Sequence, residues 1–249
     1  MLDRYVASTA RSHLVRYQFN QKVAARLIRG RILWLRGRTT SALRDIEENV
    51  AEAIALDHAM SLCNVLTQAA CPIALIAGEF DTARRYVDLL RDRTAPRSLD
   101  IWYTYAVCFE AALEMECGNI QLGLDRLQAA MAELRKSGFG HYRTSFLVMR
   151  ARGLLLLDRG SEAAGAVAEA IRICEHTGER WCLPELCRLK GEITLHQQGS
   201  AGSEAAIEDF HQALLLAREQ LALAWELRAA TSLTRCLAGD RRSQVPESC

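Results

Sequence analysis

The feature of this sequence that most constrains its fold is a glycine-centred turn that recurs at a nearly constant interval. Four segments share one layout, in which an apolar stretch is followed by a glycine, a few polar residues and a new apolar stretch: WLRGRTTSAL, LIAGEFDTAR, MECGNIQLGL and LLDRGSEAAG. Their glycines, Gly37, Gly78, Gly118 and Gly160, are 41, 40 and 42 residues apart. A fixed period of roughly 20 to 50 residues is typical of proteins that stack one structural unit repeatedly.

The segments between these turns have the composition and periodicity of helices. Ala, Leu, Arg and Glu are abundant, aromatic residues make up only 6%, and the Val/Ile alternation of strands is almost absent. Apolar residues recur at steps of three and four. The sequence therefore predicts an all-α fold with paired helices at 19–36 and 40–56, 60–77 and 80–93, 98–117 and 120–136, 143–158 and 161–177, 183–198 and 203–219, and a final helix at 222–238.

The turn residues suit the end of one helix and the start of the next. A glycine takes the left-handed conformation that ends many helices at no steric cost. The residues that follow are types that often cap a helix with their side chains, so we expect caps at Thr39 or Thr40, Asp81, Asn119 and Ser161.

Small residues recur at matching positions in the two helices of each pair. The second helix repeats a small, a larger apolar and again a small residue, most fully as Ala206, Phe210 and Ala213. Twelve positions before the first of these small residues, the first helix also carries a small residue: Gly30, Cys71, Ala111 and Ala151, with Gly191 in that place in the last pair. Helices approach most closely where side chains are small, and such hairpins bury one face only against their neighbours.

This pattern predicts a tetratricopeptide-like solenoid of about five helical hairpins plus a final helix; an irregular helical bundle is the alternative. We expect residues 19–238 to form a single array, residues 1–18 to be poorly structured and residues 239–249 to form a disordered tail. Pro72 falls inside a predicted helix and should kink it.

Composition excludes several classes of function. The formal net charge is +1, so we expect no direct nucleic-acid binding. No apolar run reaches the roughly 18 residues of a membrane span, and the N-terminus lacks the apolar core of a secretory signal. We therefore expect no membrane contact and a cytoplasmic location. The nine cysteines form no CxxC pair and are expected to be free thiols on apolar helix faces.

Chemical motifs are also missing from the sequence. None of the six histidines belongs to an HExxH motif or a zinc-type Cys/His cluster. Cys182 and Cys187 do not share a helix face, and Cys174 and His176 point apart, so neither pair suggests a metal site or an activated nucleophile. The acidic pairs Glu47/Glu48 and Glu114/Glu116 are predicted to be solvated. We expect no enzyme activity, no catalytic residue, no cofactor and no metal.

Several segments resemble a known family. ERWCLPELCRLKGEITL, EDFHQALLLAREQ and LAWELRAATSLTR, together with RGRILWLRG and LCNVLTQAACPIALIAGE, resemble the C-terminal helical-repeat region of large bacterial multidomain regulators. In those proteins a winged-helix or adenylate cyclase domain and a signal-transduction ATPase domain come before the repeats. The resemblance covers about residues 20–238. The chain contains no GxxxxGK[ST] motif, so the ATPase activity does not carry over. The repeats begin near residue 20 and no winged-helix or cyclase segment is present, so the DNA-binding and cyclase activities do not carry over either. A stand-alone repeat protein and a split or truncated gene product are both open.

The resemblance and the repeat together suggest where a partner would bind. In such arrays the first helix of each pair lines the concave face, and the residues counted onto that face are Arg31, Trp34, Gln68, Tyr105, Arg152, Glu185, Arg188 and Glu192. The leading expectation is a non-catalytic scaffold that binds a protein partner, or other domains of a regulator, through this face. One alternative is a sensor that binds a metabolite in the concave groove.

A further alternative is a fragment that is inactive alone. The last helix then leaves apolar residues uncovered, which predicts a homodimer through the C-terminal helix. The residues concerned are Leu221, Leu223, Trp225, Leu227 and Leu233.

Overall fold

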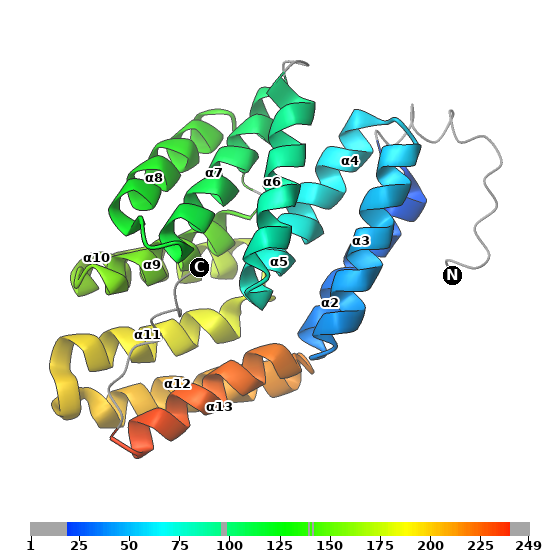
Figure 1. Ribbon diagram of the computed structural model, residues 1–249. Helices are drawn as coiled ribbons and strands as arrows, with labels where there is room; N and C mark the ends of the chain where they lie inside the picture. The colour runs from blue at the N-terminus through cyan, green and yellow to red at the C-terminus, as the bar shows by residue number, and fades with distance from the viewer. Residues whose placement is uncertain (1–18, 96–98, 139, 141, 240–249) are drawn as a thin grey trace. The chain divides into compact units, whose positions relative to one another are not determined.

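The structure, a computed structural model, describes residues 19–95, 99–138, 140 and 142–239. Regular secondary structure in this part of the chain is helical, with no strand (Figure 1). The predicted all-α fold class is therefore confirmed. The helices in chain order are α2 (Gln21–Leu35), α3 (Thr39–Ala55), α4 (Ala59–Val65), α5 (Cys71–Ala77), α6 (Phe80–Thr94), α7 (Asp100–Glu116), α8 (Ile120–Lys136), α9 (Arg143–Leu156), α10 (Gly160–Thr177), α11 (Leu183–Gln198), α12 (Ser203–Glu219) and α13 (Leu223–Leu237).

Consecutive helices run back and forth and pack side by side as hairpins, as α2 with α3, α9 with α10 and α11 with α12 illustrate (Figure 1). The predicted helix limits agree with the observed ones to within about two residues at most ends. The segments 1–18 and 240–249, where we expected poor structure and a disordered tail, lie outside the described residues.

One turn geometry recurs in four of the hairpins. A residue with positive φ follows the first helix, and the next backbone amide donates to the carbonyl five residues earlier, at 2.9 Å in every case. The donor and acceptor pairs are Arg38 and Leu33, Glu79 and Ala74, Asn119 and Glu114, and Arg159 and Leu154.

Three of the four predicted glycines hold the left-handed position in this turn, and one does not. Gly37, Gly78 and Gly118 have φ of 74°, 79° and 92°. In the fourth turn Asp158 takes that conformation, with φ 60°, and Gly160 is instead the first residue of α10. The backbone repeat therefore has intervals of 41, 40 and 40 residues, which is more regular than the glycine spacing.

Of the predicted caps, only Asn119 takes an N-cap position. The N-cap residues of α3, α6, α8 and α10 are Arg38, Glu79, Asn119 and Arg159, and none of their side chains makes a capping hydrogen bond. Two of the four are arginines, whose side chains have only donors and cannot accept from a helix amide. The expected caps at Thr39 or Thr40, Asp81 and Ser161 fall inside the first turns of their helices.

Pro72 produces a local change of helical register. Between α4 and α5 the chain forms a π turn, Leu66–Ala70, in which the amide of Cys71 donates to the carbonyl of Leu66, five residues back. A proline lacks the amide that an α-helix needs and its ring clashes with the preceding turn, so the π turn accommodates it. The kink expected at Pro72 thus takes the form of a π turn.

The continuous helical segment Ala59–Ala77 is also unusually apolar. Within the described part of the chain it alone is long and apolar enough to cross a membrane by length and composition, although no run of its sequence was predicted to span one. However, 78% of its apolar window is buried inside the structure, as expected of a core helix.

Small residues mark the closest helix approaches, as the repeat predicted. Ala42, Ala83, Ala163 and Ala206 in the second helices are 0% exposed, and so are Cys71, Ala111 and Ala151 in the first helices. A Cβ atom added to Gly30 would lie 2.6 Å from Cγ1 of Ile46, and one added to Gly191 would lie 2.6 Å from Cε1 of Phe210. These two glycines allow their helix pairs to touch.

The chain divides into two compact units, residues 1–113 and residues 114–249. The first contains α2 to α6 around core residues such as Leu27, Ile46 and Leu66. The second contains α8 to α13 and includes Leu127, Phe146 and Phe210 in its core. Helix α7 begins in the first unit and ends in the second.

Candidate functional site

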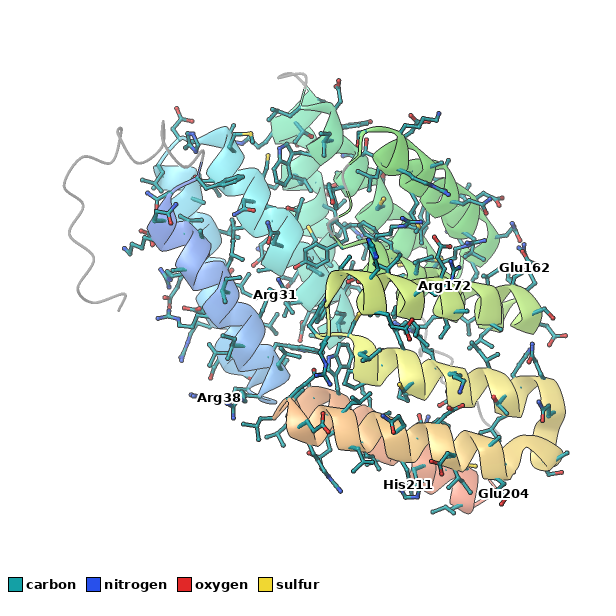
Figure 2. The ribbon with its side chains drawn as sticks, turned by 180° about the vertical axis from the view of Figure 1, so that it is seen from behind. Arg31, Arg38, Glu162, Arg172, Glu204 and His211 are labelled. Carbon is teal, nitrogen blue, oxygen red and sulfur yellow. The ribbon has the colours of Figure 1, made fainter. Side chains whose placement is uncertain are left out.

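The four groove residues expected in the first unit do not form a common site. Arg31 on α2 is half-buried (Figure 2). Gln68 lies in the π turn, where its Nε2 donates to Oδ1 of Asn64. Trp34 is 4% exposed and Tyr105 is 1% exposed. Trp34 and Tyr105 thus belong to the core of the first unit rather than to an accessible concave face, because their positions face neighbouring helices.

The four groove residues expected in the second unit do lie together. Arg152 comes from α9, and the other three come from one side of α11, where steps of three and four residues place side chains on a shared face. Helix α13 packs beside α11 and adds two more polar side chains. We call the resulting set the charged cluster: Arg152, Glu185, Arg188, Glu192, Arg228 and Ser232.

Glu185 is the centre of the charged cluster. It is 2% exposed, and each of its carboxylate oxygens accepts hydrogen bonds from two arginines. Nε and Nη2 of Arg188 donate at 2.8 and 3.0 Å, and Nε and Nη2 of Arg228 donate at 3.2 and 2.8 Å. Two arginine forks thus clasp one buried carboxylate, which is the geometry that makes such pairs strong.

These contacts decide the ionisation of Glu185. Burial by itself would raise the pKa of the carboxyl, but the charges of Arg188 and Arg228 and their hydrogen bonds outweigh it and hold the pKa well below its ordinary value. Glu185 is therefore an anion with all its acceptor positions used. It is not available as a general base.

Arg188 connects this buried pair to a more accessible edge of the cluster. Its Nη1 donates to Oε1 of Glu192 and to Oγ of Ser232, both at 3.0 Å, and the Ser232 hydroxyl donates to the same Glu192 oxygen at 2.6 Å. The side chain of Glu192 is 30% exposed. The network therefore runs from the core to a surface between α9 and α11.

Arg152 approaches this edge from α9. Its Nη1 lies 3.1 Å from Oε1 of Glu116, whose side chain is 16% exposed. The neighbouring Glu114 pairs with Arg126, and its Oε2 is buried. The prediction that Glu114 and Glu116 form a solvated face is therefore wrong, since both turn toward arginines of the next helices.

A small pocket opens where the charged cluster meets α9. It has a volume of about 90 Å³ and is lined by Arg152, Leu155, Leu156, Arg188, Leu189, Glu192 and His196. Nε2 of His196 lies 2.9 Å from Oδ1 of the exposed Asp158. The pocket thus combines polar and charged side chains with three leucines, and both α9 and α11 contribute to each kind.

An aromatic layer fixes α13 against α11 at the other end of the cluster. Nε1 of Trp225 donates to the carbonyl of Trp181 at 2.7 Å, and the two indole rings are 6.0 Å apart. The Arg228 guanidinium lies 5.8 Å from the centre of the Trp225 ring, an arrangement that favours a cation. Packing against the Trp225 ring therefore orients the Arg228 side chain toward Glu185.

The outer helices of this unit carry a different kind of surface. Glu162 and Arg172 project from α10, and Glu204 and His211 project from α12, on exposed faces that bear both signs of charge (Figure 2). Such mixed charge is ordinary for a solvated face. The groups that converge lie on α9, α11 and α13.

The described residues hold no cluster of His, Cys, Asp or Glu that could bind a metal ion. Their eight cysteines are free thiols. Cys174 and Cys182 are hydrogen-bonded to each other, which lowers the pKa of Cys174 and raises that of Cys182. Both are buried, and His176 is exposed. Both thiols are therefore shielded from solvent.

Sequence reasoning missed Arg228 and Ser232, which lie 43 and 44 residues beyond their partners Glu185 and Arg188. The sequence signal that could have revealed Arg228 and Ser232 lay in the segments that carry the resemblance. Its two most specific segments, ELCRLKGE and WELRAATSL, contain the five residues of this network on α11 and α13, so each segment supplies the partners of the other.

The chain matches no protein-family model, and no curated protein matches it significantly.

Proposed function

We propose that this chain is a tetratricopeptide-like solenoid that acts as a non-catalytic scaffold for protein–protein interaction. The observation that carries the proposal is the recurrence of one turn, with the same 2.9 Å closing hydrogen bond, at intervals of 41, 40 and 40 residues. The buried small residues at matching positions of successive pairs support the same interpretation. Arrays of this kind expose an extended face and bind partners with it.

The resemblance to bacterial regulators narrows the proposed role. On that basis the scaffold is the regulatory or sensing module of a transcriptional regulator or cyclase, and its partners are a separate protein or the other domains of the regulator. It works in the cytoplasm without touching nucleic acid or membrane directly. The saturated hydrogen bonding of Glu185 is in keeping with a role other than catalysis.

The accessible part of the predicted inner face offers a test of the scaffold role. Arg31, a half-buried residue of α2, belongs to the predicted face, and Arg38 is an exposed arginine in the turn that follows α2 (Figure 2). Immobilised wild-type chain and its Arg31→Glu and Arg38→Glu variants would be incubated with extract of the source cells, and retained proteins quantified by mass spectrometry. We expect a partner that wild type and Arg38→Glu retain and that Arg31→Glu loses.

The retained protein would then be purified and its affinity measured for the three chains. A partner that binds through the inner face loses affinity only for Arg31→Glu. The scaffold proposal is contradicted if wild type retains nothing beyond what unmodified beads retain.

A second function, a metabolite sensor, is favoured by one observation: the 90 Å³ pocket between α9 and α11. It lies on first helices of successive pairs, where the concave groove was expected. Ligand binding there would stabilise the folded chain by mass action, so a rise in melting temperature separates this function from pure scaffolding.

A further alternative is a fragment with no activity of its own, which self-associates through α13. Leu223, Leu227 and Leu237 on this helix are 54%, 70% and 67% exposed. The occupant of this surface would be a second copy of the chain.

A further inference from the structure

The three arginines of the charged cluster differ in the number of their partners. Glu185 accepts hydrogen bonds from both Arg188 and Arg228, and Glu192 and Ser232 accept further hydrogen bonds from Arg188. Among the described residues Arg152 has one ion pair, to Glu116 at 3.1 Å, and its side chain is 29% exposed. It is therefore the guanidinium of the cluster that reaches the pocket with the least compensation.

The electrostatic surroundings of Arg152 agree with this geometry. Burial, together with the positive charges of Arg228 and Arg188, lowers the pKa of Arg152 despite the opposing effect of Glu116 and Glu185. In contrast, acidic partners raise the pKa of Arg188 despite its burial. A negatively charged group placed next to Arg152 would add a second acidic partner to the one that Glu116 supplies and so favour the charged guanidinium.

The shape of the pocket limits what that group can be. A volume of about 90 Å³ is well below the roughly 300 Å³ at which drug-sized ligand sites begin, yet it exceeds what one water needs. Leu155 and Leu156 of α9 and Leu189 of α11 give the pocket apolar lining, and a hydrated inorganic anion gains nothing from contact with them. The carboxylate of Glu192, which also lines the pocket, disfavours a ligand with more than one negative charge.

We propose that the pocket formed by Arg152, Arg188 and His196 with Leu155, Leu156 and Leu189 binds a short aliphatic monocarboxylate. The carboxylate accepts hydrogen bonds from the Arg152 guanidinium, whose planar fork matches its two oxygens, and the alkyl chain packs on the leucines. Glu192 accepts hydrogen bonds from Arg188 and Ser232, which offset part of its negative charge toward the ligand. Such a ligand joins α9 to α11 and links the pocket to α13 through Arg188.

This inference does not depend on the scaffold function. The partner test uses Arg31 on α2 in the first unit, whereas the pocket is built entirely from α9 and α11 in the second. A failed partner test would not contradict the ligand proposal, and a failed ligand test would not contradict the scaffold function.

The test is a titration of the full chain by calorimetry and by thermal unfolding. The probes are butyrate, butanol and inorganic phosphate at equal ionic strength. We expect butyrate to bind and to raise the melting temperature, and butanol and phosphate to do neither at the same concentrations. Butanol lacks the charge that Arg152 recognises, and phosphate lacks the alkyl chain.

Three variants locate the binding. Arg152→Gln removes the guanidinium and should weaken butyrate binding by about tenfold or more, the usual effect of losing a charged hydrogen-bonding partner. Leu155→Phe fills the pocket without changing its charge and should abolish binding. Arg172→Gln alters an exposed arginine on α10 and should bind butyrate like wild type (Figure 2). Circular dichroism checks that each variant is folded.

The proposal is overturned by butyrate that fails to bind wild type, by binding that survives either pocket variant, or by phosphate that binds as well as butyrate. If Arg152→Gln does not fold, the Leu155→Phe result decides alone, because this substitution leaves every ion pair of the cluster in place.

Discussion

Gly191 is the residue at which α11 and α12 come into direct contact. A Cβ atom there would lie 2.6 Å from Cε1 of Phe210 and 3.0 Å from the backbone carbonyl of Ala206. Phe210 is 0% exposed and the carbonyl belongs to a helix, so neither neighbour can easily move. The contact explains at atomic level why the repeat needs a small residue at this place.

We therefore expect Gly191→Ala to lower the free energy of unfolding by about 1–3 kcal/mol, the usual cost of overpacking, although alanine favours helices. Urea denaturation followed by circular dichroism measures it. Gly165→Ala in the exposed middle of α10 is the matched control, because nothing lies within 4 Å of its added Cβ. It should stabilise the chain by up to about 1 kcal/mol. Equal effects at the two sites would disprove the close contact.

Glu185 is the second residue at which a single substitution should strongly lower stability. Glu185→Gln leaves the charges of Arg188 and Arg228 close together without their shared partner, so we expect a loss of about 3–5 kcal/mol at neutral pH. Glu162→Gln, at an exposed ion pair with Arg159, should change stability little, because water and salt screen such a pair. Denaturant titration of the two variants and wild type at pH 7 tests this. Similar, small losses in both variants would show that the pair contributes little.

The low pKa of Glu185 also predicts how the stability of the chain depends on pH. The folded pKa of Glu185 lies below the unfolded value of about 4.3, so the folded state binds fewer protons and the stabilisation is present above that value. It is lost as the pH falls from about 5 toward the folded pKa. The difference in stability between wild type and Glu185→Gln should therefore shrink over this interval. A difference that stays constant from pH 6 to pH 3 would contradict the depressed pKa.

At the residue scale, sequence reasoning found what depends on local spacing and missed what depends on packing between pairs. Steps of three and four along α11 were enough to place Glu185, Arg188 and Glu192 on one face. Their burial was not evident, because it results from Arg228, which arrives 43 residues later on a different helix. Trp34 was placed on an open face for the same reason, since periodicity shows a face but not what covers it.

At the scale of elements, the helices themselves were predictable because glycine, polar turn and apolar periodicity agree at the four turns that define the repeat. The details of the turns were not. Asp158 replaces glycine at a left-handed position, and the N-cap that follows is Arg159, whose side chain cannot accept a hydrogen bond. Residue preferences describe averages over many turns and do not fix which residue takes the cap position of one particular turn.

Helix α13 presents an apolar stripe that suits pairing with itself. Its exposed and half-buried positions 223, 227, 230, 234 and 237 follow steps of four and three, the spacing of a coiled-coil seam. In an antiparallel pair centred on Ala230, Leu223 would face Leu237 of the second copy, and Leu227 would face Thr234. The small Ala230 would allow the two helices to approach at the crossing.

If the chain forms this dimer, Leu227→Glu should convert it to a monomer, because two glutamates would be buried in the seam. Light scattering after size-exclusion chromatography measures the mass over a range of concentrations. Leu122→Glu is the matched control, since Leu122 on α8 is 54% exposed and lies outside the stripe. A wild-type chain that is monomeric at high concentration would rule out pairing through α13.

At the scale of the whole molecule, the division into two units bears on how the chain unfolds. Packing in each unit is between helices that are near neighbours in sequence, such as α2 with α3 in the first and α11 with α12 and α13 in the second. In such arrays stability is a sum of contributions from each repeat and from neighbouring interfaces. If the chain is a single array, a local disturbance should spread from one end of the chain to the other. If it consists of two units, the disturbance should stay within one unit.

Hydrogen exchange after a core truncation distinguishes them. Phe210→Ala removes a fully buried ring from between α11 and α12 and should cost about 3–5 kcal/mol locally. If the units open separately, the amides of α11, α12 and α13 should exchange faster while those of α2 and α3 keep their wild-type rates. Ile46→Ala in the first unit is the reciprocal variant and should accelerate α2 and α3 alone. Faster exchange throughout the chain in either variant would mean that the two units unfold as one, with α7 transmitting the loss of structure from one core to the other.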